Sequence, residues 1–149
     1  MSLSLNGVSL SLGGRPLVRN LTLSLEPGEV IGLLGPNGAG KTTSFNLVIG
    51  LLRPDSGEVL LDGHPVASLS MPKRARLGIG YLPQEPSVFR QLTVRENLQL
   101  VLDQSGLARS QSRERLQQLI RDFHLEPFLN RRGYQLSGGE RRRCEVARA

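Results

Sequence analysis

The sequence predicts an α/β protein, on three observations. Apolar residues alternate with polar ones near the N-terminus, a continuous apolar run then leads into a glycine-rich loop, and amphipathic helical patterns fill the second half. The chain has 149 residues, which suffices for about one domain with a sizeable core. We therefore expect an N-terminal antiparallel β region, a buried strand followed by a helix, and a helical insertion.

The β region is predicted from period-two alternation. Val8, Leu10 and Leu12 alternate with serines, and a Gly-Gly turn separates them from a second alternating stretch that ends at 26–28. Strands joined by so short a turn pair antiparallel. A further short strand is predicted at 58–61, between two turn signals.

The continuous apolar run at 30–34 differs from these alternating stretches. Such a run is typical of a central parallel strand buried on both faces. It leads into a glycine-rich loop and then into a helix predicted over 42–49, which Gly50 closes as a C-cap. A second buried strand is predicted at 79–82.

Helical patterns dominate from residue 85 onward. Thr93 and Glu96 form a capping box, and a second apolar stripe at helical spacing runs from Leu116 to Phe123. The helix after the capping box has four apolar residues on one face: Val94, Leu98, Val101 and Leu102. We assign both stripes to the core and expect 85–137 to be a helical insertion.

Composition excludes several classes of protein. No apolar run approaches the ~18 residues of a membrane-spanning helix, the N-terminus lacks a signal-peptide pattern, and the single cysteine, Cys144, rules out an internal disulfide. The net charge is +6, carried almost wholly by arginine, since Lys41 and Lys73 are the only lysines. A nucleic-acid or anionic-lipid surface and an ordinary solvated surface both explain this charge. The basic residues are spread out and lack interleaved aromatics, which favours the second reading, so no nucleic-acid partner is expected.

One motif carries phosphate chemistry. Residues 35–42 match the phosphate-binding loop pattern G-x-x-x-x-G-K-[ST], in the required context between a strand and a helix. Its glycines let backbone N–H groups converge on an anion, and the following helix adds the positive end of its dipole. The Lys41 ammonium would reach the β- and γ-phosphates, and the Thr42 hydroxyl would ligate Mg²⁺. The residues expected to bind nucleotide are Gly35, Pro36, Asn37, Gly38, Ala39, Gly40, Lys41, Thr42 and Thr43.

A second motif, Leu136-Ser137-Gly138-Gly139-Glu140, lies near the C-terminus. Together with the phosphate loop it resembles the nucleotide-binding subunits of ABC transporters, and 141–149 fits the helix that follows the family's signature motif. Gln84 matches the family's Q-loop glutamine. The stretches 78–85, 87–90 and 135–143 are most similar to the cytoplasmic ATPase subunits of lipopolysaccharide export transporters, although branched-chain amino-acid importers are similar in places.

The resemblance implies an ABC-type phosphate-loop ATPase fold and a mechanism. Residues 1–149 would form a partial nucleotide-binding domain: 1–84 the β region and first half of the core, 85–137 the helical subdomain, and 138–149 the start of the signature helix. Two subunits would form a head-to-tail homodimer with ATP and Mg²⁺ between the phosphate loop of one and the signature motif of the other. The signature residues that contact the partner's ATP would be Ser137, Gly138 and Gly139.

The same resemblance implies the partners and the location. Gln84 would contact Mg²⁺ and the attacking water, and integral membrane subunits would dock near 84–90, with Phe89 either in the docking groove or in the core. The subunit would be cytoplasmic, on the inner face of the inner membrane, and would drive export of lipopolysaccharide or a related lipid.

Two departures from the family pattern limit these expectations. Leu12 stands where the family has an aromatic residue that stacks on adenine, so we expect weak apolar contact there. The chain is expected to end before the Walker B strand and its catalytic glutamate, so it should bind ATP without efficient hydrolysis and leave an open apolar sheet edge. Alternative readings are a branched-chain amino-acid importer ATPase, a soluble ABC protein acting on ribosomes or nucleic acid, and a non-catalytic nucleotide-binding fragment.

Overall fold

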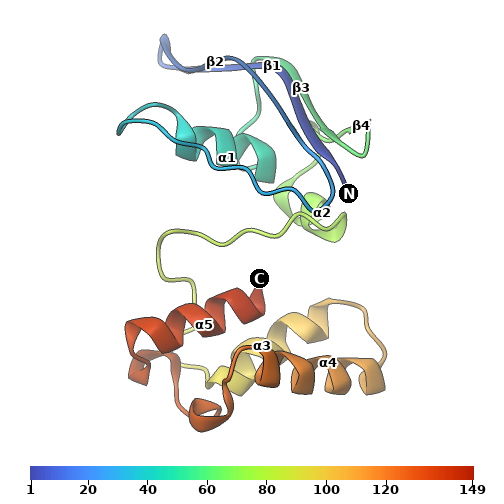
Figure 1. The fold of residues 1–149 in the computed structure, drawn as a ribbon, viewed down its shortest axis with the longest axis vertical. Helices are drawn as coiled ribbons and strands as arrows, with labels where there is room; N and C mark the ends of the chain where they lie inside the picture. Colours follow the sequence, from blue (N-terminus) through green and yellow to red (C-terminus); the bar gives the residue numbers. More distant parts are fainter. The chain divides into compact units, whose positions relative to one another are not determined.

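The computed structural model describes residues 1–149, which divide into two units. The first unit contains a four-stranded antiparallel sheet in the order β2-β1-β3-β4 (Figure 1). The units are 1–80 and 81–149. The strands are β1 (Leu3–Leu12), β2 (Arg15–Leu25), β3 (Ser56–Leu61) and β4 (His64–Pro65). The predicted antiparallel β region is therefore confirmed, and its first strand starts five residues earlier than the alternation at Val8 indicates.

The first core lies between this sheet and the helix α1 (Lys41–Ile49). Leu5, Val8 and Val59 point from the sheet into this core, where Leu47 of α1 is completely buried. The alternation of β1 and β3 supplies one apolar face, and α1 covers it. The predicted helix and its C-cap are confirmed, because Gly50 adopts the left-handed conformation, with φ of 84°.

A short helix, α2 (Met71–Arg76), has no counterpart among the predicted elements. It begins at Ser70, with Pro72 in its first turn, where proline is well tolerated. Its six residues are too few and too polar to show an apolar period, so no periodic signal marks it.

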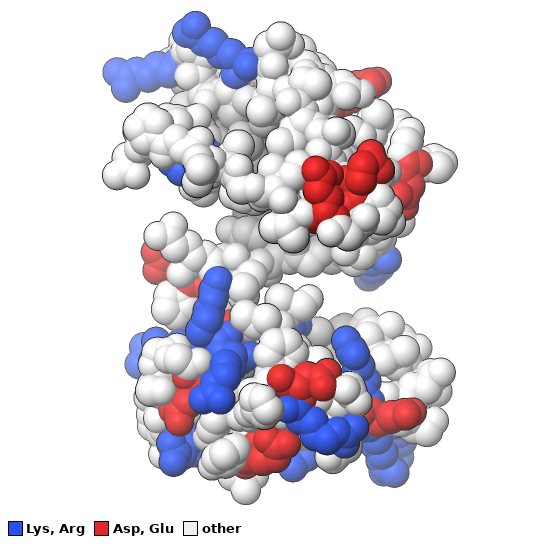
Figure 2. Space-filling view, viewed as in Figure 1, with Lys and Arg blue, Asp and Glu red and all other residues white.

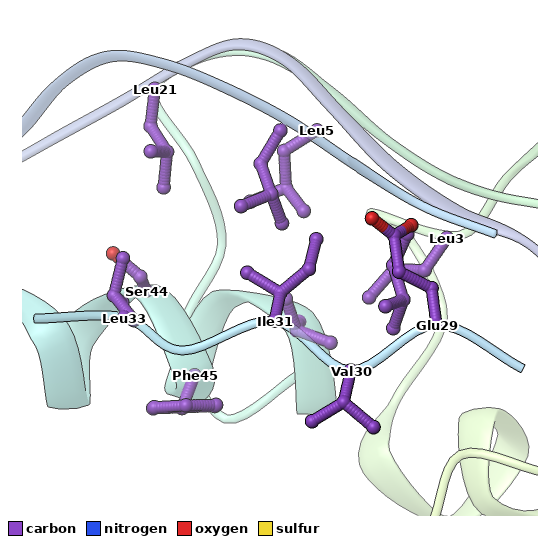
Figure 3. A pocket seen from close by; sticks show the side chains of 12 residues that line it. Leu3, Leu5, Leu21, Glu29, Val30, Ile31, Leu33, Ser44 and Phe45 are labelled. Carbon is purple, nitrogen blue, oxygen red and sulfur yellow. The ribbon is translucent and has the colours of Figure 1, made fainter.

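Residues 30–34 do not form a strand, contrary to the prediction. No strand pairing involves this segment, and Val30 and Leu34 are 94% and 93% exposed. A buried central strand needs hydrogen-bonded neighbours on both edges, whereas β1 to β4 pair only with one another. Ile31 points towards Leu5 in the sheet, while Val30 points away from it (Figure 3).

The strand predicted at 79–82 is also absent, for the same reason. No pairing partner lies alongside these residues, and the segment runs as irregular chain. Ile79 nevertheless packs against the first core, so the apolar character that suggested a strand reflects burial. The division between the two units falls within this segment, after Gly80. The expected division of the complete domain at residues 84 and 85 stays a prediction.

The second unit is helical. Its elements are α3 (Val94–Gln104), α4 (Arg109–Asp122), the 3₁₀ turns η1 (Glu126–Phe128) and η2 (Gly133–Gln135), and α5 (Gly138–Arg148). The predicted capping box of Thr93 and Glu96 is confirmed at the start of α3. Val94, Leu98 and Leu102 are buried in the second core.

The prediction for Val101 is wrong. This residue is 40% exposed, because the core of the second unit covers a narrower stripe of α3 than the sequence pattern indicates. No helix in the structure combines the length and the apolar character needed to cross a bilayer. On the face shown in Figure 2, acidic and basic side chains are interspersed over the helical unit. Neither sign of charge forms an unbroken stripe there.

Candidate functional site

The predicted phosphate loop is a tight curl in which two glycines adopt left-handed backbone conformations that other residues rarely adopt. The N–H of Ala39 donates to the carbonyl of Pro36 at 3.2 Å, which turns the chain back on itself. Gly38 and Gly40 follow with φ of 82° and 88°. A Cβ on Gly40 would lie 2.5 Å from the carbonyl oxygen of Leu17 in β2, so the loop also rests directly on the backbone of the sheet.

The Lys41 side chain stabilises this curl through hydrogen bonds to the loop backbone. Its Nζ donates to the carbonyl oxygens of Gly35 and Pro36, at 2.6 Å and 2.7 Å. The ammonium therefore lies over the loop, which is the place that phosphate binding requires. Its hydrogen bonds to the loop were not foreseen from the sequence.

The N-terminal turn of α1 presents N–H groups without partners. No side chain caps this helix, and its first turn contains no acidic residue. No hydrogen bond in the structure uses the N–H groups of Gly38, Gly40, Lys41, Thr42 or Thr43. Unpaired N–H groups at a helix N-terminus form an anion-binding site, with the helix dipole and a nearby ammonium adding positive potential. Thr42 is exposed, so its hydroxyl is accessible to a ligand.

One cavity lies beside the glycine-rich loop and a second beside the segment that leads into it. One, of about 340 Å³, lies between β2 and the loop, and Leu17, Gly38 and Lys41 contribute to its wall. The other, of about 310 Å³, lies between the sheet and residues 29–33 and is almost wholly apolar, with Glu29 and Ser44 as its polar members (Figure 3). The first has the polar groups that an anion needs, whereas the second does not.

Leu12, expected on the adenine side, lies at the end of β1 opposite Arg15 in the hairpin. Its side chain is 52% exposed, so it offers an apolar surface without ring stacking. Contact with adenine at this position stays a prediction.

The signature motif begins α5 through a complete capping box. The Ser137 Oγ accepts the N–H of Glu140 at 3.4 Å, and the Glu140 carboxylate accepts the N–H of Ser137 at 2.8 Å. The hydrogen bonds from Ser137 lower the pKa of Glu140, and the nearby Arg131 adds to this effect. Ser137 is thus the N-cap of α5.

The backbone of the two signature glycines, at the start of α5, is not covered by any side chain. A Cβ on Gly138 or Gly139 would meet no atom within 4 Å, and neither residue has a positive φ. No hydrogen bond uses their N–H groups. Nothing within this chain therefore requires glycine at these positions, whereas the close approach of an external group would.

α5 also holds the segment that follows Gln84. Glu145 is buried, and its carboxylate accepts the N–H groups of Ser87 and Val88 at 2.7 Å and 3.3 Å. The Arg148 guanidinium donates to the Ser87 hydroxyl at 2.8 Å. Sequence reasoning missed the role of Glu145; the only available signal was an acidic residue flanked by the apolar positions of an otherwise arginine-rich helix.

Gln84 and Phe89 both face solvent within the second unit. The side chain of Gln84 is exposed and makes no hydrogen bond. The ring of Phe89 is 48% exposed, with the Arg148 guanidinium 5.0 Å from its centre, so it is not a core aromatic. Its backbone is fixed by the buried Asn97, whose amide accepts the Phe89 N–H at 2.8 Å and donates to the Phe89 carbonyl at 3.1 Å. The protruding ring thus stands on a rigid support.

The phosphate loop before α1 and the capped glycine pair at the start of α5 can be compared with the features of known proteins. The family described as ABC transporter matches residues 18–149. This chain belongs to the ABC transporter family. The family's fold accounts for the sheet, the loop and the helical unit described above.

Individual relatives agree with this assignment. The lipopolysaccharide export system ATP-binding protein LptB of Acidithiobacillus ferridurans is 50% identical over 135 residues, which are 91% of this chain. The protein of the same description in Escherichia coli K12 is 44% identical over 149 residues, 99% of this chain. A probable ABC transporter ATP-binding protein of Azorhizobium caulinodans is 49% identical over 148 residues.

Solved structures of ABC transporter proteins have the same fold. An ATP-binding subunit of an ABC transporter superposes with a TM-score of 0.86 at 29% identity, covering all of this chain and 61% of that one. A dimeric ATP-binding cassette bound to ADP and phosphate superposes with a TM-score of 0.81 at 28% identity, covering 98% of this chain and 68% of that one. The chain spans 56% of the Acidithiobacillus relative, 62% of the Escherichia coli relative and 53% of the Azorhizobium relative.

Proposed function

We propose that this chain is the nucleotide-binding portion of an ABC transporter ATPase that binds Mg·ATP at the phosphate loop. The observation that carries the proposal is the set of unpaired N–H groups that converge at the start of α1, under the Lys41 ammonium. A triphosphate tail supplies the negative charge that such a site favours. The Thr42 hydroxyl is the proposed protein ligand of Mg²⁺, and Gln84 would approach the same ion in the assembled site.

The signature motif would complete the site of a second copy. Gly138 and Gly139 leave accessible N–H groups at the start of α5, and the Ser137 hydroxyl lies beside them. A γ-phosphate held by the phosphate loop of a partner would accept these hydrogen bonds. The dimeric cassette among the structures of the same fold supports this arrangement. In that homodimer, closure would depend on the γ-phosphate and opening would follow its loss.

Membrane subunits are the proposed partners of the segment around Phe89. An exposed aromatic ring on a backbone fixed by Asn97 and Glu145 is a suitable anchor for a helix of another protein. The lipopolysaccharide export relatives support export of lipopolysaccharide or a related lipid as the task of the complete protein, at the cytoplasmic face of the inner membrane. In that protein ATP hydrolysis would drive the transport.

The 149 residues themselves are proposed to bind ATP without efficient hydrolysis. A general base must reach the attacking water. The Glu140 carboxylate is held by the N–H of Ser137, and the Glu145 carboxylate is buried against Ser87 and Val88. Neither glutamate of α5 is free to serve as that base.

Calorimetric titration of the chain with Mg·ATP tests nucleotide binding. We expect saturable binding, weakened about 100-fold in Lys41→Met, because a charge-assisted hydrogen bond to phosphate is lost. Lys73→Met is the matched control, since Lys73 is the only other lysine and lies exposed on α2. The control should bind as the unmodified chain does.

Two results would contradict the proposal. One is an unmodified, folded chain that fails to bind Mg·ATP. The other is equal binding by Lys41→Met and Lys73→Met, which would show that the nucleotide binds elsewhere. Phosphate release should stay at background in all three proteins, and Lys41-dependent release would contradict the proposed absence of a base.

A further inference from the structure

Arg74 on α2 is a charged residue with no exposed surface and no carboxylate partner. Its guanidinium donates only to backbone carbonyls: Nη1 to Leu47 and Val48 at 2.6 Å each, Nε to Leu69 at 3.1 Å, and Nη2 to Ala67 at 3.1 Å. None of the ion pairs in the structure includes it. A buried charge without a counter-charge is costly, so its retention calls for a compensating interaction.

The compensating interaction is with the C-terminal end of α1. Leu47 and Val48 lie in the last turn of that helix, where carbonyl groups have no partner within the helix and carry the negative end of its dipole. α1 has no basic residue of its own in this turn. Arg74 therefore supplies from α2 the cation that the last turn of α1 lacks.

The other end of α1 is the phosphate loop. The helix is nine residues long, so its two ends are separated by about 13 Å. An anion at the N-terminus is attracted by the near, positive end and repelled by the far, negative end. A buried cation at the far end cancels that repulsion, and low exposure keeps it from being screened by solvent and salt.

Arg74 also fixes the direction of the helix. Through its Nε and Nη2 it joins the end of α1 to the 67–69 segment, and through its own backbone to α2. The rotation of α1 about its C-terminal end would displace every N–H group at its start. The guanidinium thus determines both the charge behind the loop and the orientation of the loop's donors.

We propose that Arg74 is a positioning residue for the phosphate loop, acting through α1 on the affinity for the polyphosphate part of the nucleotide. The inference rests on the proposed function of the loop. It assigns a role in ligand binding to a residue that touches no part of the ligand.

The test measures the binding of inorganic tripolyphosphate and of Mg·ATP under conditions in which each variant is fully folded. Arg74→Met should weaken both ligands by a similar factor, about threefold to tenfold, and Arg74→Lys should restore most of the loss because it returns the charge. A role in stability alone would lower the urea midpoint of Arg74→Met without changing the dissociation constant of the folded protein. Unchanged affinity in folded Arg74→Met therefore overturns the inference.

A second pair of variants disturbs the guanidinium without removing it. A Cβ on Gly50 would lie 2.8 Å from the Arg74 Nε, whereas a Cβ on Gly63 would meet no atom within 4 Å. Both glycines have similar positive φ, 84° and 76°, so alanine brings the same backbone strain to each. Gly50→Ala should weaken tripolyphosphate binding and Gly63→Ala should not. Equal binding by the two folded variants would contradict the inference.

A measurement on the unmodified chain needs no variant. The Nε–H resonance of Arg74 should shift when tripolyphosphate saturates the loop, and a resonance that does not move would also overturn the proposal. If the unmodified, folded chain binds neither tripolyphosphate nor Mg·ATP, the proposed function fails together with this inference. If it binds both and the Arg74 variants bind equally well, only this inference fails.

Discussion

The two glycine-rich helix N-termini of this chain differ in how their N–H groups are satisfied. At α1 no side chain caps the helix, no acidic residue lies in the first turn, and the N–H groups stay unpaired. At α5 Ser137 and Glu140 cap the helix and each other, so that only Gly138 and Gly139 keep free N–H groups. We therefore expect the start of α1 to bind an anion by itself. The capped start of α5 would only add the N–H groups of Gly138 and Gly139 to an anion held by another group.

The comparison extends to what each glycine does. At the phosphate loop, Gly40 allows the chain to rest on the backbone of β2. At the signature motif, glycine serves no contact within the chain. Substitution of Gly40 should therefore destabilise the fold, whereas substitution of the signature glycines should weaken only the binding of an external group.

The largest expected effect comes from alanine at these glycines. Gly40→Ala places a Cβ against the Leu17 carbonyl at a φ of 88°, which should destabilise the chain by about 3 kcal/mol or more. Gly139→Ala should leave stability unchanged or raise it slightly, because alanine is the better helix former. Urea denaturation without nucleotide measures both. A similar loss of stability in the two variants would break the comparison.

The next largest expected loss of stability comes from Glu145, which joins α5 to the segment at Ser87 and Val88. Glu145→Ala leaves the N–H groups of Ser87 and Val88 buried without an acceptor, which should cost about 2 kcal/mol. Glu145→Gln keeps an acceptor oxygen in place and should cost clearly less. The denaturation midpoints of the two variants decide this. If alanine and glutamine have equal effects, the hydrogen bonds do not stabilise the segment.

Removal of a hydroxyl at each helix start should give a smaller difference. Ser137→Ala removes the N-cap of α5 and should cost about 1 kcal/mol of stability. Thr42→Ala removes a hydroxyl that caps nothing, so stability without ligand should not change. The same Thr42→Ala variant should weaken Mg·ATP binding more than tripolyphosphate binding without Mg²⁺. Thermal unfolding and titration provide the two readouts.

The smallest expected effect is a pH dependence that α5 has and α1 lacks. The hydrogen bonds from Ser137 lower the pKa of Glu140 below its ordinary value of 4.5, so its contribution to stability is present above that value. The contribution is lost as the pH falls through the lowered pKa of the folded state. Glu140→Gln should therefore flatten the loss of stability below about pH 4.5. An unaltered acid limb in the variant would show that the capping carboxylate contributes nothing.

Local signals predicted much of this fold. The helix α1, its Gly50 cap and the capping box at Thr93 depend on residues within one or two turns, and all are found. The strands expected at 30–34 and 79–82 depend on neighbours supplied by distant parts of the chain, and both predictions are wrong for this structure. The pattern of apolar residues predicts whether a segment tends to be buried. It does not predict whether another strand lies alongside to pair with it.

The site shows the same division. The curl of the loop, its positive φ angles and the capped signature helix follow from glycine and serine positions in the sequence. The roles of Arg74 and Glu145 depend on backbone groups of residues 27 and 58 positions away in the chain, and no spacing rule could have found them. Nucleotide contacts of Leu12, Gln84 and the signature residues remain predictions.

The two hydrogen bonds of the Lys41 ammonium have a consequence for how its variants are read. An ammonium carries three protons, and two of them already go to Gly35 and Pro36, so one is left to point outward. The Lys41 ammonium thus stabilises the curl through two hydrogen bonds and has one proton left that could bind a ligand. Arginine, whose donors lie in a rigid plane, cannot reproduce this division of protons. A loss of affinity in a neutral variant such as Lys41→Met therefore combines a deformed loop with a missing charge.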